Sequence, residues 1–465
     1  MKIKIDNLHG ICDYTHPKFQ ALREEYKVDN PNYWRAIKMS PYAKRYYYFI
    51  TQKGKFSLGH LPAIVRLCDK LNISIEIEDT RLHKNIFKPF TKQLGEYTLY
   101  EHQYKALQHS SNTLTINGQD IPYNRGIYKM ATNSGKSFII ASKCVHLNEG
   151  HKAVIFVHTV DLLNQFFKAL KNFGLNVGAF GGKHKKTSVF LECDIIILTY
   201  KSYLSYHTKS KEVKAFTKSV DLLIVDECHR ASAKDYATAI KLFKNATNVY
   251  GFSGTPFKKM GLADKTVYGL FGDILMEVSN EDMQKIGVSL TPVVKMYEVE
   301  CGYFYSYQES YEQNIVFSQA RVDKMAQYIK HNPDRQILIP VKRLDHGKFI
   351  YDALYKICDC RFVSATHKFR EYLFEQYSKK EYQVLITTLG QEGLNLPIDT
   401  LIYARAEESI VSLLQYVGRI LRLEGNTKNI EIVDFYDKDN KNLEKHSKKR
   451  IKIYKEEKFK TMLLY

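Results

Sequence analysis

The chain has 465 residues, which is enough for about three domains of ordinary size. Its 69 Lys and Arg residues outnumber 50 Asp and Glu residues, and the resulting net charge of +19 favours a polyanionic partner such as nucleic acid. No stretch reaches the roughly 18 apolar residues of a membrane helix, and the amino terminus lacks the apolar core of a secretory signal. We therefore expect a cytosolic protein with no membrane partner. Its eight cysteines are scattered, without metal-binding spacing, and are expected to be reduced thiols.

Residues 1 to about 90 predict a small α/β module. Residues 46–59 (YYYFITQKGKFSLG) predict a strand and a turn, residues 61–72 (LPAIVRLCDKLN) a helix, and residues 73–79 (ISIEIED) a strand. Basic and aromatic residues are interleaved here, which fits either contacts with a nucleic-acid strand or ordinary strand packing. The residues concerned are Arg45, Tyr46, Tyr48, Lys53, Lys55 and Phe56.

From about residue 130, short apolar runs alternate with turns and helical periodicity, which is typical of parallel sheets flanked by helices. The first series of strands is expected at 153–158, 194–200, 222–227 and 248–255, and the second at 336–341, 384–388, 400–405 and 430–435. Residues 278–320 are interpreted as an irregular connection between the two series. The basic residues of 441–465 are interpreted as a solvated surface. The expected division is an accessory domain at 1–90, a first α/β domain at 91–280, and a second α/β domain with a basic tail at 281–465.

A phosphate-binding loop is predicted at residues 130–137 (MATNSGKS), between the strand 126–130 and the helix from 138. Backbone N–H groups of such a loop, with the positive end of the next helix, bind phosphates. Lys136 is expected to reach the β- and γ-phosphates of ATP, and Ser137 to bind Mg²⁺. The first position of the pattern is Met130 in place of glycine, so a chance sequence remained an alternative for this motif alone.

Two adjacent carboxylates, Asp226 and Glu227, end the apolar run 222–227, which places them at the carboxyl edge of a sheet, where ligands of such folds bind. Asp226 is expected to hold Mg²⁺, and Glu227 to orient and deprotonate the attacking water. An acid pair at a strand end is also a common surface feature.

A third motif, residues 414–422 (LQYVGRILR), spaces Gln415, Arg419 and Arg422 so that all three project from one face of a helix. Two guanidinium groups on such a face can stabilise the charge that develops on a transferred γ-phosphate. A solvated basic helix face was the alternative.

Together these motifs resemble those of superfamily 2 helicases and translocases over about residues 97–440. Residues 97–104 (YTLYEHQY) resemble the adenine-reading motif. Residues 130–137, 226–229 (DECH), 253–256 (SGTP), 336–346, 387–397 and 415–422 resemble motifs I to VI. The resemblance implies two tandem RecA-like domains. Within the superfamily, the GRILR ending of motif VI and the amino-terminal module are similar to the phage-encoded UvsW-type helicases and the related XPB- and RecG-like motors.

The resemblance also implies a set of site residues. The nucleotide-binding residues are Gln103, Thr132, Asn133, Ser134, Gly135, Lys136 and Ser137; the catalytic residues are Lys136, Asp226, Glu227, Gln415, Arg419 and Arg422; Ser137 and Asp226 are the metal ligands. The residues expected to contact nucleic acid are Thr159, Lys183, Thr199 and Thr388, for which a local cap or turn is an equal alternative. His229, Ser253 and Thr255 are expected to couple hydrolysis to movement. Asn133 and Asn395 replace the more usual glycine and aspartate of their motifs.

The sequence therefore predicts a monomeric, ATP- and Mg²⁺-dependent DNA helicase that acts on forked or branched DNA without sequence preference, in the host cytoplasm if a phage encodes it. A double-strand translocase that separates no strands and an RNA-directed helicase are alternatives within the family. Outside it, the alternatives are a kinase or simple ATPase whose turnover ignores DNA, and a binding protein that has lost hydrolysis; the intact Lys136, Glu227 and arginines argue against the last.

Overall fold

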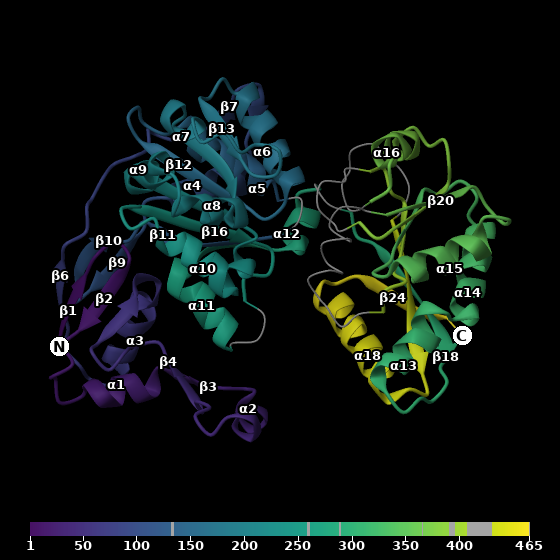
Figure 1. Ribbon diagram of the computed structural model, residues 1–465, viewed down its shortest axis with the longest axis horizontal. Helices are drawn as coiled ribbons and strands as arrows, with labels where there is room; N and C mark the ends of the chain where they lie inside the picture. Colours follow the sequence, from purple (N-terminus) through teal and green to yellow (C-terminus); the bar gives the residue numbers. More distant parts are fainter. Residues whose placement is uncertain are drawn as a thin grey trace. The chain divides into compact units, whose positions relative to one another are not determined.

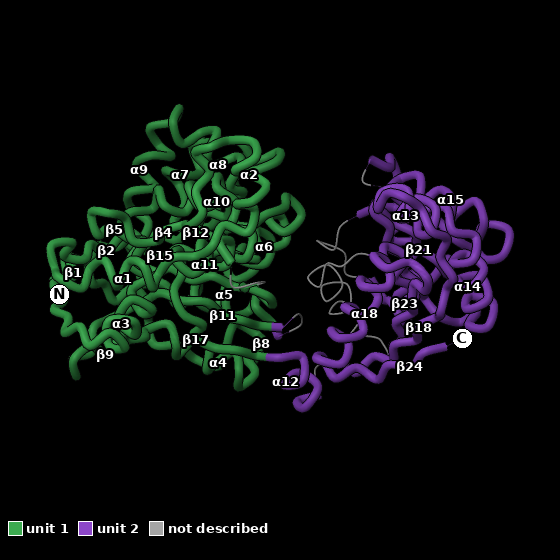
Figure 2. The backbone as a smooth tube through the Cα atoms, turned by 90° about the horizontal axis from the view of Figure 1, so that it is seen from below, with its two compact units in different colours: residues 1–130, 135–278 green, residues 131–134, 279–465 purple. Residues whose placement is uncertain are grey.

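The computed structural model describes residues 1–131, 134–257, 261–287, 290–364, 366–389, 396–406 and 430–464. It divides into two compact units, coloured separately in Figure 2: residues 1–130 with 135–278, and residues 131–134 with 279–465. All eight cysteines are described and are free thiols, as expected. Within the described ranges, no helix has both the length and the apolar character that crossing a membrane requires.

The amino-terminal module is built on a four-stranded sheet in the order β5-β2-β1-β6, in which only the β1–β6 pair is parallel. Its strands are β1 (Lys2–Ile5), β2 (His9–Cys12), β5 (Lys55–Ser57) and β6 (Glu76–Asp79); its helices are α1 (Phe19–Glu25), α3 (Leu61–Lys70) and the turn η1 (Leu58–His60). A hairpin of β3 (Lys27–Asp29) and β4 (Tyr46–Tyr48) carries α2 (Tyr33–Met39) and projects from the module (Figure 1). Phe56 belongs to the buried core, so it is not a base-stacking residue; strand packing explains it.

The second layer of unit 1 is a seven-stranded parallel sheet in the order β13-β14-β12-β15-β16-β11-β17. The strands are β11 (Arg125–Met130), β12 (Lys152–Val157), β13 (Val177–Phe180), β14 (Ile195–Thr199), β15 (Val220–Asp226), β16 (Asn248–Ser253) and β17 (Ile274–Val278). The helices are α4 (Glu101–Gln108), α5 (Lys136–Val145), α6 (Val160–Asn172), α7 (Val189–Glu192), α8 (Tyr200–His207), α9 (Lys211–Ser219), η2 (Cys228–Ser232), α10 (Lys234–Lys241) and α11 (Leu262–Phe271). Two short hairpins, β7 (Gln93–Leu94) with β8 (Tyr97–Thr98) and β9 (Thr113–Ile116) with β10 (Gln119–Pro122), precede β11.

The amino-terminal module is fixed to this sheet through α11 and the turn after it. Arg66 on α3 donates hydrogen bonds of 2.8 and 2.9 Å to the carboxylate of Asp273 and one of 2.9 Å to the Tyr268 hydroxyl. Gly59 lies so close to α11 that a Cβ atom there would be 2.3 Å from the Tyr268 carbonyl oxygen. Only glycine allows the backbone to approach this closely. This contact and the hydrogen bonds of Arg66 join the amino-terminal module to the seven-stranded sheet as one body.

Unit 2 contains the second seven-stranded parallel sheet, in the order β20-β21-β19-β22-β23-β18-β24. Its strands are β18 (Val293–Glu300), β19 (Ile337–Pro340), β20 (Cys360–Val363), β21 (Val384–Thr387), β22 (Thr400–Ile402), β23 (Glu431–Lys438) and β24 (Lys460–Leu464). Its helices are α12 (Asn280–Lys285), α13 (Tyr307–Tyr311), the π-helical turn η3 (Glu312–Val316), α14 (Gln319–Lys330), α15 (Leu344–Leu354), α16 (Arg370–Ser378) and α18 (Lys441–Glu456). The predicted fold class, two parallel-sheet domains after a small module, is confirmed.

Two predictions about unit 2 were wrong. Residues 278–320 are not an irregular connection, because they contain β18, which pairs with β23 and β24. This strand alternates buried and half-exposed residues, and its Lys295 bonds Glu431 at 2.7 Å, so it lacks the continuous apolar run of a central strand. The basic tail is not merely solvated surface either. It folds into α18 and β24, with Leu443, Arg450 and Tyr454 buried.

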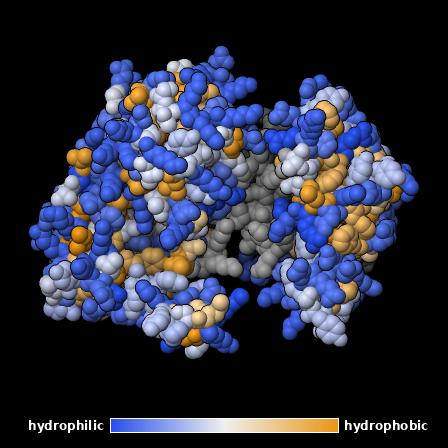
Figure 3. Space-filling view, viewed as in Figure 1, coloured by the Kyte–Doolittle hydropathy of each residue, from blue (hydrophilic) through white to orange (hydrophobic). Residues whose placement is uncertain are grey.

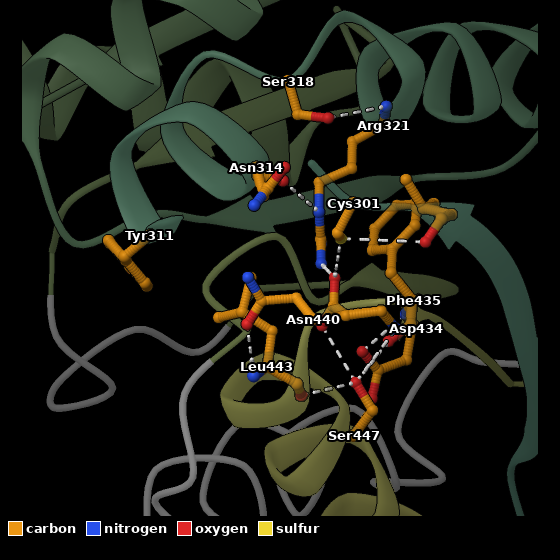
Figure 4. A network of polar contacts seen from close by, with 12 residues as sticks. Cys301, Tyr311, Asn314, Ser318, Arg321, Asp434, Phe435, Asn440, Leu443 and Ser447 are labelled. Atoms are coloured by element: carbon orange, nitrogen blue, oxygen red, sulfur yellow. Dashed lines mark hydrogen bonds and ion pairs between the residues drawn. The ribbon is translucent and has the colours of Figure 1, made fainter. Parts of the chain in front are cut away.

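A buried polar network joins β23 to α14 and α18 (Figure 4). Arg450 donates a hydrogen bond from Nε to Asp434 at 2.9 Å, and Arg321 forms an ion pair with Asp437. Ser447 donates to the other Asp437 oxygen at 2.9 Å. Both arginines are about 1% exposed, and their charges are balanced by the two buried aspartates.

Candidate functional site

The predicted phosphate loop follows β11, and α5 begins at Lys136. Gly135 caps this helix in the left-handed conformation, with φ of 77° and ψ of 35°. Lys136 donates from Nζ to the Met130 carbonyl oxygen at 3.1 Å, and Ser134 donates from Oγ to the Ala131 carbonyl oxygen at 2.7 Å. Ser137 is exposed in the first turn of α5. Thr132 and Asn133 lie outside the described residues.

Gln103 packs directly against this loop. Its side-chain oxygen accepts a hydrogen bond of 2.9 Å from the Tyr100 N–H at the start of α4, which orients the amide. A Cβ atom at Gly135 would lie 2.0 Å from Gln103 Nε2. Nearby, the rings of Tyr97 and Phe138 lie 5.3 Å apart and are partly exposed. The structure thus brings the predicted adenine-reading residue and the predicted phosphate loop together.

The acid pair stands at the end of a single strand, β15, which β16 separates from β11. Asp226 ends β15, and β15, β16 and β11 are adjacent in the sheet, so their carboxyl ends meet at one edge. Glu227 has a left-handed backbone (φ 49°, ψ 51°), a strained conformation for a residue other than glycine. Gly251 on β16 makes room for the turn, since a Cβ atom there would lie 2.9 Å from the Cys228 side chain.

The two carboxylates have opposite electrostatic environments. Burial, together with the charge of Glu227, raises the pKa of Asp226 to about 7. Burial opposes ionisation of Glu227 as well, but a hydrogen bond from His229 and the charge of Lys136 outweigh it and lower the pKa of Glu227 to about 2. Lys136 also favours the ionised form of Asp226, which places its charge within reach of both acids.

Three residues predicted to couple hydrolysis to movement lie beside Glu227. His229 Nδ1 is 3.2 Å from Glu227 Oε2 and 3.0 Å from Ser253 Oγ. Ser253, at the end of β16, donates to Glu227 Oε2 at 3.4 Å and accepts a hydrogen bond of 3.1 Å from the Thr255 N–H. The contacts run from the acid pair to the segment that follows β16.

His158 was not selected from the sequence, although it lies near the acid pair. It directly follows β12, and its charge favours the ionised forms of both Asp226 and Glu227. Its position one residue after an apolar strand was the signal that could have identified it, because Glu227 stands in the same position after β15.

The residues predicted to contact nucleic acid in unit 1 lie at the carboxyl ends of β12, β14 and β13, the three strands on the other side of β15. Thr159 caps α6, accepting a hydrogen bond of 3.3 Å from the Leu162 N–H. Thr199 is buried and donates to Ser202 Oγ at 3.0 Å. Lys183 is exposed after the turn at Gly181, and a Cβ atom at Gly181 would lie 2.8 Å from Thr199 Oγ1. The structure thus groups the three segments, while both threonines also have local roles.

In unit 2, Thr388 follows β21 and is half-buried, next to Thr387, which donates to the Val363 carbonyl oxygen at 2.8 Å. The remaining predicted residues, Gln415, Arg419 and Arg422, lie outside the described residues, as does Asn395.

Residues 96–258 match the family described as "Type III restriction enzyme, res subunit", and residues 305–424 match the "Helicase conserved C-terminal domain". Together the two regions cover well over half of the chain, in the order of the two parallel sheets. The chain belongs to the superfamily 2 helicases. Every predicted site residue lies within one of the matched regions of this ATP-dependent family, whereas residues 1–95 lie outside both.

Viral proteins named as helicases are among the relatives. The chain is 23% identical over 387 residues to a protein of Sulfolobus islandicus filamentous virus that is named as a helicase. The aligned region covers 75% of this chain and 66% of that protein. It is 23% identical over 405 residues to the ATP-dependent DNA helicase uvsW of Enterobacteria phage T4, covering 82% and 78%. The chain spans slightly less than two thirds of the first relative.

Among solved structures, Mss116p bound to ssRNA and AMP-PNP matches with a TM-score of 0.54 and 16% identity, covering 79% of this chain and 75% of that one. The Hef helicase domain of Pyrococcus furiosus matches with a TM-score of 0.50 and 13% identity, covering 75% and 97%. At these identities the likeness concerns the fold alone.

Proposed function

We propose that this superfamily 2 protein is an ATP-dependent DNA helicase that remodels forked or branched DNA. The observation that carries the proposal is the sheet edge in unit 1. Lys136 begins the helix that follows β11, the acid pair stands at the end of β15 with β16 between the two strands, and Gln103 on α4 packs against Gly135. DNA as the substrate is supported by the name of the phage T4 relative and by the net charge of +19.

Each residue of this edge has a distinct proposed role. Gln103 reads adenine, and Lys136 with the N–H groups of the loop binds the ATP phosphates. Glu227 orients and deprotonates the attacking water; its contact with His229 favours the ionised carboxylate, the form that can accept a proton. Arg419, Arg422 and Gln415 are proposed to stabilise the charge on the transferred phosphate.

The residues present fit a magnesium ion. Asp226 and Ser137 offer the oxygen ligands that Mg²⁺ prefers, and two adjacent buried carboxylates, one with a raised pKa, form a site that a cation would stabilise. Asp226 and Ser137 would hold the ion, and when bound it would neutralise phosphate charge.

The path of the nucleic acid is proposed to follow the other half of the same edge. Thr159, Lys183 and Thr199, with Thr388 in unit 2, would contact phosphates, which carry no base sequence, so binding is expected to be sequence-independent. His229, Ser253 and Thr255 would transmit the state of the nucleotide to the segment after β16.

The test measures ATP turnover with single-stranded, duplex, forked and four-way DNA and with RNA. We expect stimulation by DNA, greatest with branched forms, and strand separation that needs ATP. Lys136→Ala and Glu227→Gln should abolish turnover and leave DNA binding in place. Turnover that DNA does not stimulate would refute the proposal, and stimulation by RNA alone would refute the choice of DNA. Full activity of either variant would refute the assigned roles.

A further inference from the structure

The hairpin formed by β3, α2 and β4 exposes large apolar side chains at its tip. Trp34 is 73% exposed, Met39 84% and Tyr42 90%. None of the residues of α2 is buried, so this helix packs against no core of its own. Trp34 is also the single tryptophan of the chain. Large exposed aromatic groups gathered on one projection are unusual for a protein surface and indicate a binding function.

The same tip is strongly basic. Arg35, Lys38, Lys44 and Arg45 are all exposed, and residues 30–45 contain no aspartate or glutamate. Within the described chain no carboxylate pairs with any of these four cations. Figure 3 shows blue and orange side chains side by side on this projection. Cations next to exposed rings are the combination that binds a phosphate backbone and its bases together.

The base of the hairpin is rigidly held although its tip is not covered. Tyr48 donates a hydrogen bond of 2.9 Å to Glu24, and the Arg23 guanidinium lies 3.7 Å from the centre of the Tyr48 ring. Arg23 also donates to the Ile50 carbonyl oxygen at 3.1 Å. Because α1 and α3 belong to the module that Arg66 fixes to α11, the tip is carried by the unit that contains Lys136 and Asp226.

We propose that the tip of this hairpin, residues 30–45, binds single-stranded DNA, with Trp34 and Tyr42 stacking on unpaired bases and the four cations contacting the flanking phosphates. The inference rests on the proposed function, since it takes DNA as the substrate. It adds a binding site outside both matched family regions, suited to the unpaired bases at a fork. A lipid surface fits less well, because the apolar groups are few and separated by charge.

The single tryptophan allows a test on the unaltered protein. Tryptophan emission of the full chain is recorded during titration with a single-stranded oligothymidylate, with the same oligomer as a duplex, and with anionic lipid vesicles. We expect single-stranded DNA to quench the emission and to reduce quenching by iodide, with little change for the duplex. Emission that DNA leaves unchanged, or that responds only to vesicles, would overturn the inference.

Variants measure the contribution of stacking. Trp34→Ala should weaken binding of single-stranded DNA about 5- to 150-fold, the range of a single base–aromatic stack, and Trp34→Phe should restore part of the loss. Tyr305→Ala is the matched control for Tyr42→Ala, because Tyr305 is 98% exposed but its nearest charged neighbours in sequence are acidic. If Tyr42→Ala weakens binding no more than this control, the inference fails.

Failure here is distinguishable from failure of the proposed function. If DNA stimulates ATP turnover normally while Trp34→Ala binds single-stranded DNA like the unaltered protein, the hairpin site is wrong and the helicase assignment stands. If DNA has no effect on turnover at all, the proposed function is wrong.

Discussion

Replacing Gly135 by alanine tests the contact between the phosphate loop and Gln103. Residue 135 has φ of 77°, and its added Cβ atom would lie 2.0 Å from Gln103 Nε2. A left-handed residue other than glycine costs about 1–2 kcal/mol. Gln103 would also have to move from the Tyr100 N–H, which it bonds at 2.9 Å, at a further cost of about 0.5–1.5 kcal/mol. The expected total for Gly135→Ala is about 1.5–3.5 kcal/mol.

This free energy appears in one of two measurable quantities. If the loop relaxes in the protein without nucleotide, ATP binding weakens by about 10- to 400-fold. If the loop stays strained, the free energy of unfolding falls by the same amount. Calorimetric titration with a non-hydrolysable ATP analogue and denaturant unfolding of the same variant therefore measure the sum.

Two comparisons separate the causes. Gly118 has the same φ of 77° but no atom within 4 Å of a Cβ, so Gly118→Ala should show backbone strain alone and leave ATP binding unchanged. In a Gln103→Ala background, Gly135→Ala should be less damaging than in the unaltered protein, since the clash is gone. Equal effects in both backgrounds, or a sum below about 0.5 kcal/mol, would refute this account of the loop.

Three further variants address pH, stability and coupling. Burial lowers the pKa of His60 to about 3, so His60 stays neutral in the folded protein, whereas in the unfolded chain it takes up a proton below about pH 6.5. As the pH falls below about 6.5, the free energy of unfolding should therefore decrease by about 1.4 kcal/mol per pH unit. In acid unfolding curves, His60→Gln should make this decrease smaller. Arg450→Met should lower the free energy of unfolding of unit 2 by about 3–5 kcal/mol, because it leaves the charge of Asp434 buried without its partner. Lys452 is exposed on the same helix, so Lys452→Met should change the denaturant unfolding curve little. Equal destabilisation by the two substitutions would contradict the burial argument. Ser253→Ala should leave ATP turnover unchanged but reduce the rate of unwinding about 2- to 10-fold, the effect expected for the loss of one hydrogen bond. If ATP turnover and unwinding fall by the same factor, Ser253 does not couple one to the other.

The sequence predicted the strands with long apolar runs in both sheets and did not predict β13, β17, β18, β20 or β24. β14 and β15 are buried along their whole length, and β12 is buried at every residue after Lys152; all three were identified from β-branched runs. β18 was missed because its charged residues, such as Lys295, are satisfied by partners far away in the sequence. Arg450 illustrates the same limit, since composition counts it as surface charge although Asp434 neutralises it in the core.

The sequence could predict those residues of the candidate site that lie directly after a strand of the parallel sheet. Parallel strands bring their carboxyl ends to one edge, so Lys136 and Asp226 could be expected together. The contact of Gln103 with Gly135 and the position of His158 depend on side-chain packing that no spacing reveals. The sequence also does not reveal which aromatic side chains are exposed. Phe56 and Trp34 belong to the same basic module, yet Phe56 lies in the core and Trp34 is 73% exposed.

The packing of the amino-terminal module limits how it can take part in movement. Glu227 contacts Ser253 at the end of β16, and α11 begins only nine residues later, at Leu262. The same helix and the turn after it carry the module, through the Tyr268 backbone against Gly59 and the Asp273 carboxylate against Arg66. A bidentate ion pair and backbone contact without intervening side chains leave little freedom for a hinge at this point. The hairpin therefore moves with the unit that contains Lys136 and Asp226, and a DNA strand held at Trp34 would be displaced by whatever motion that unit makes.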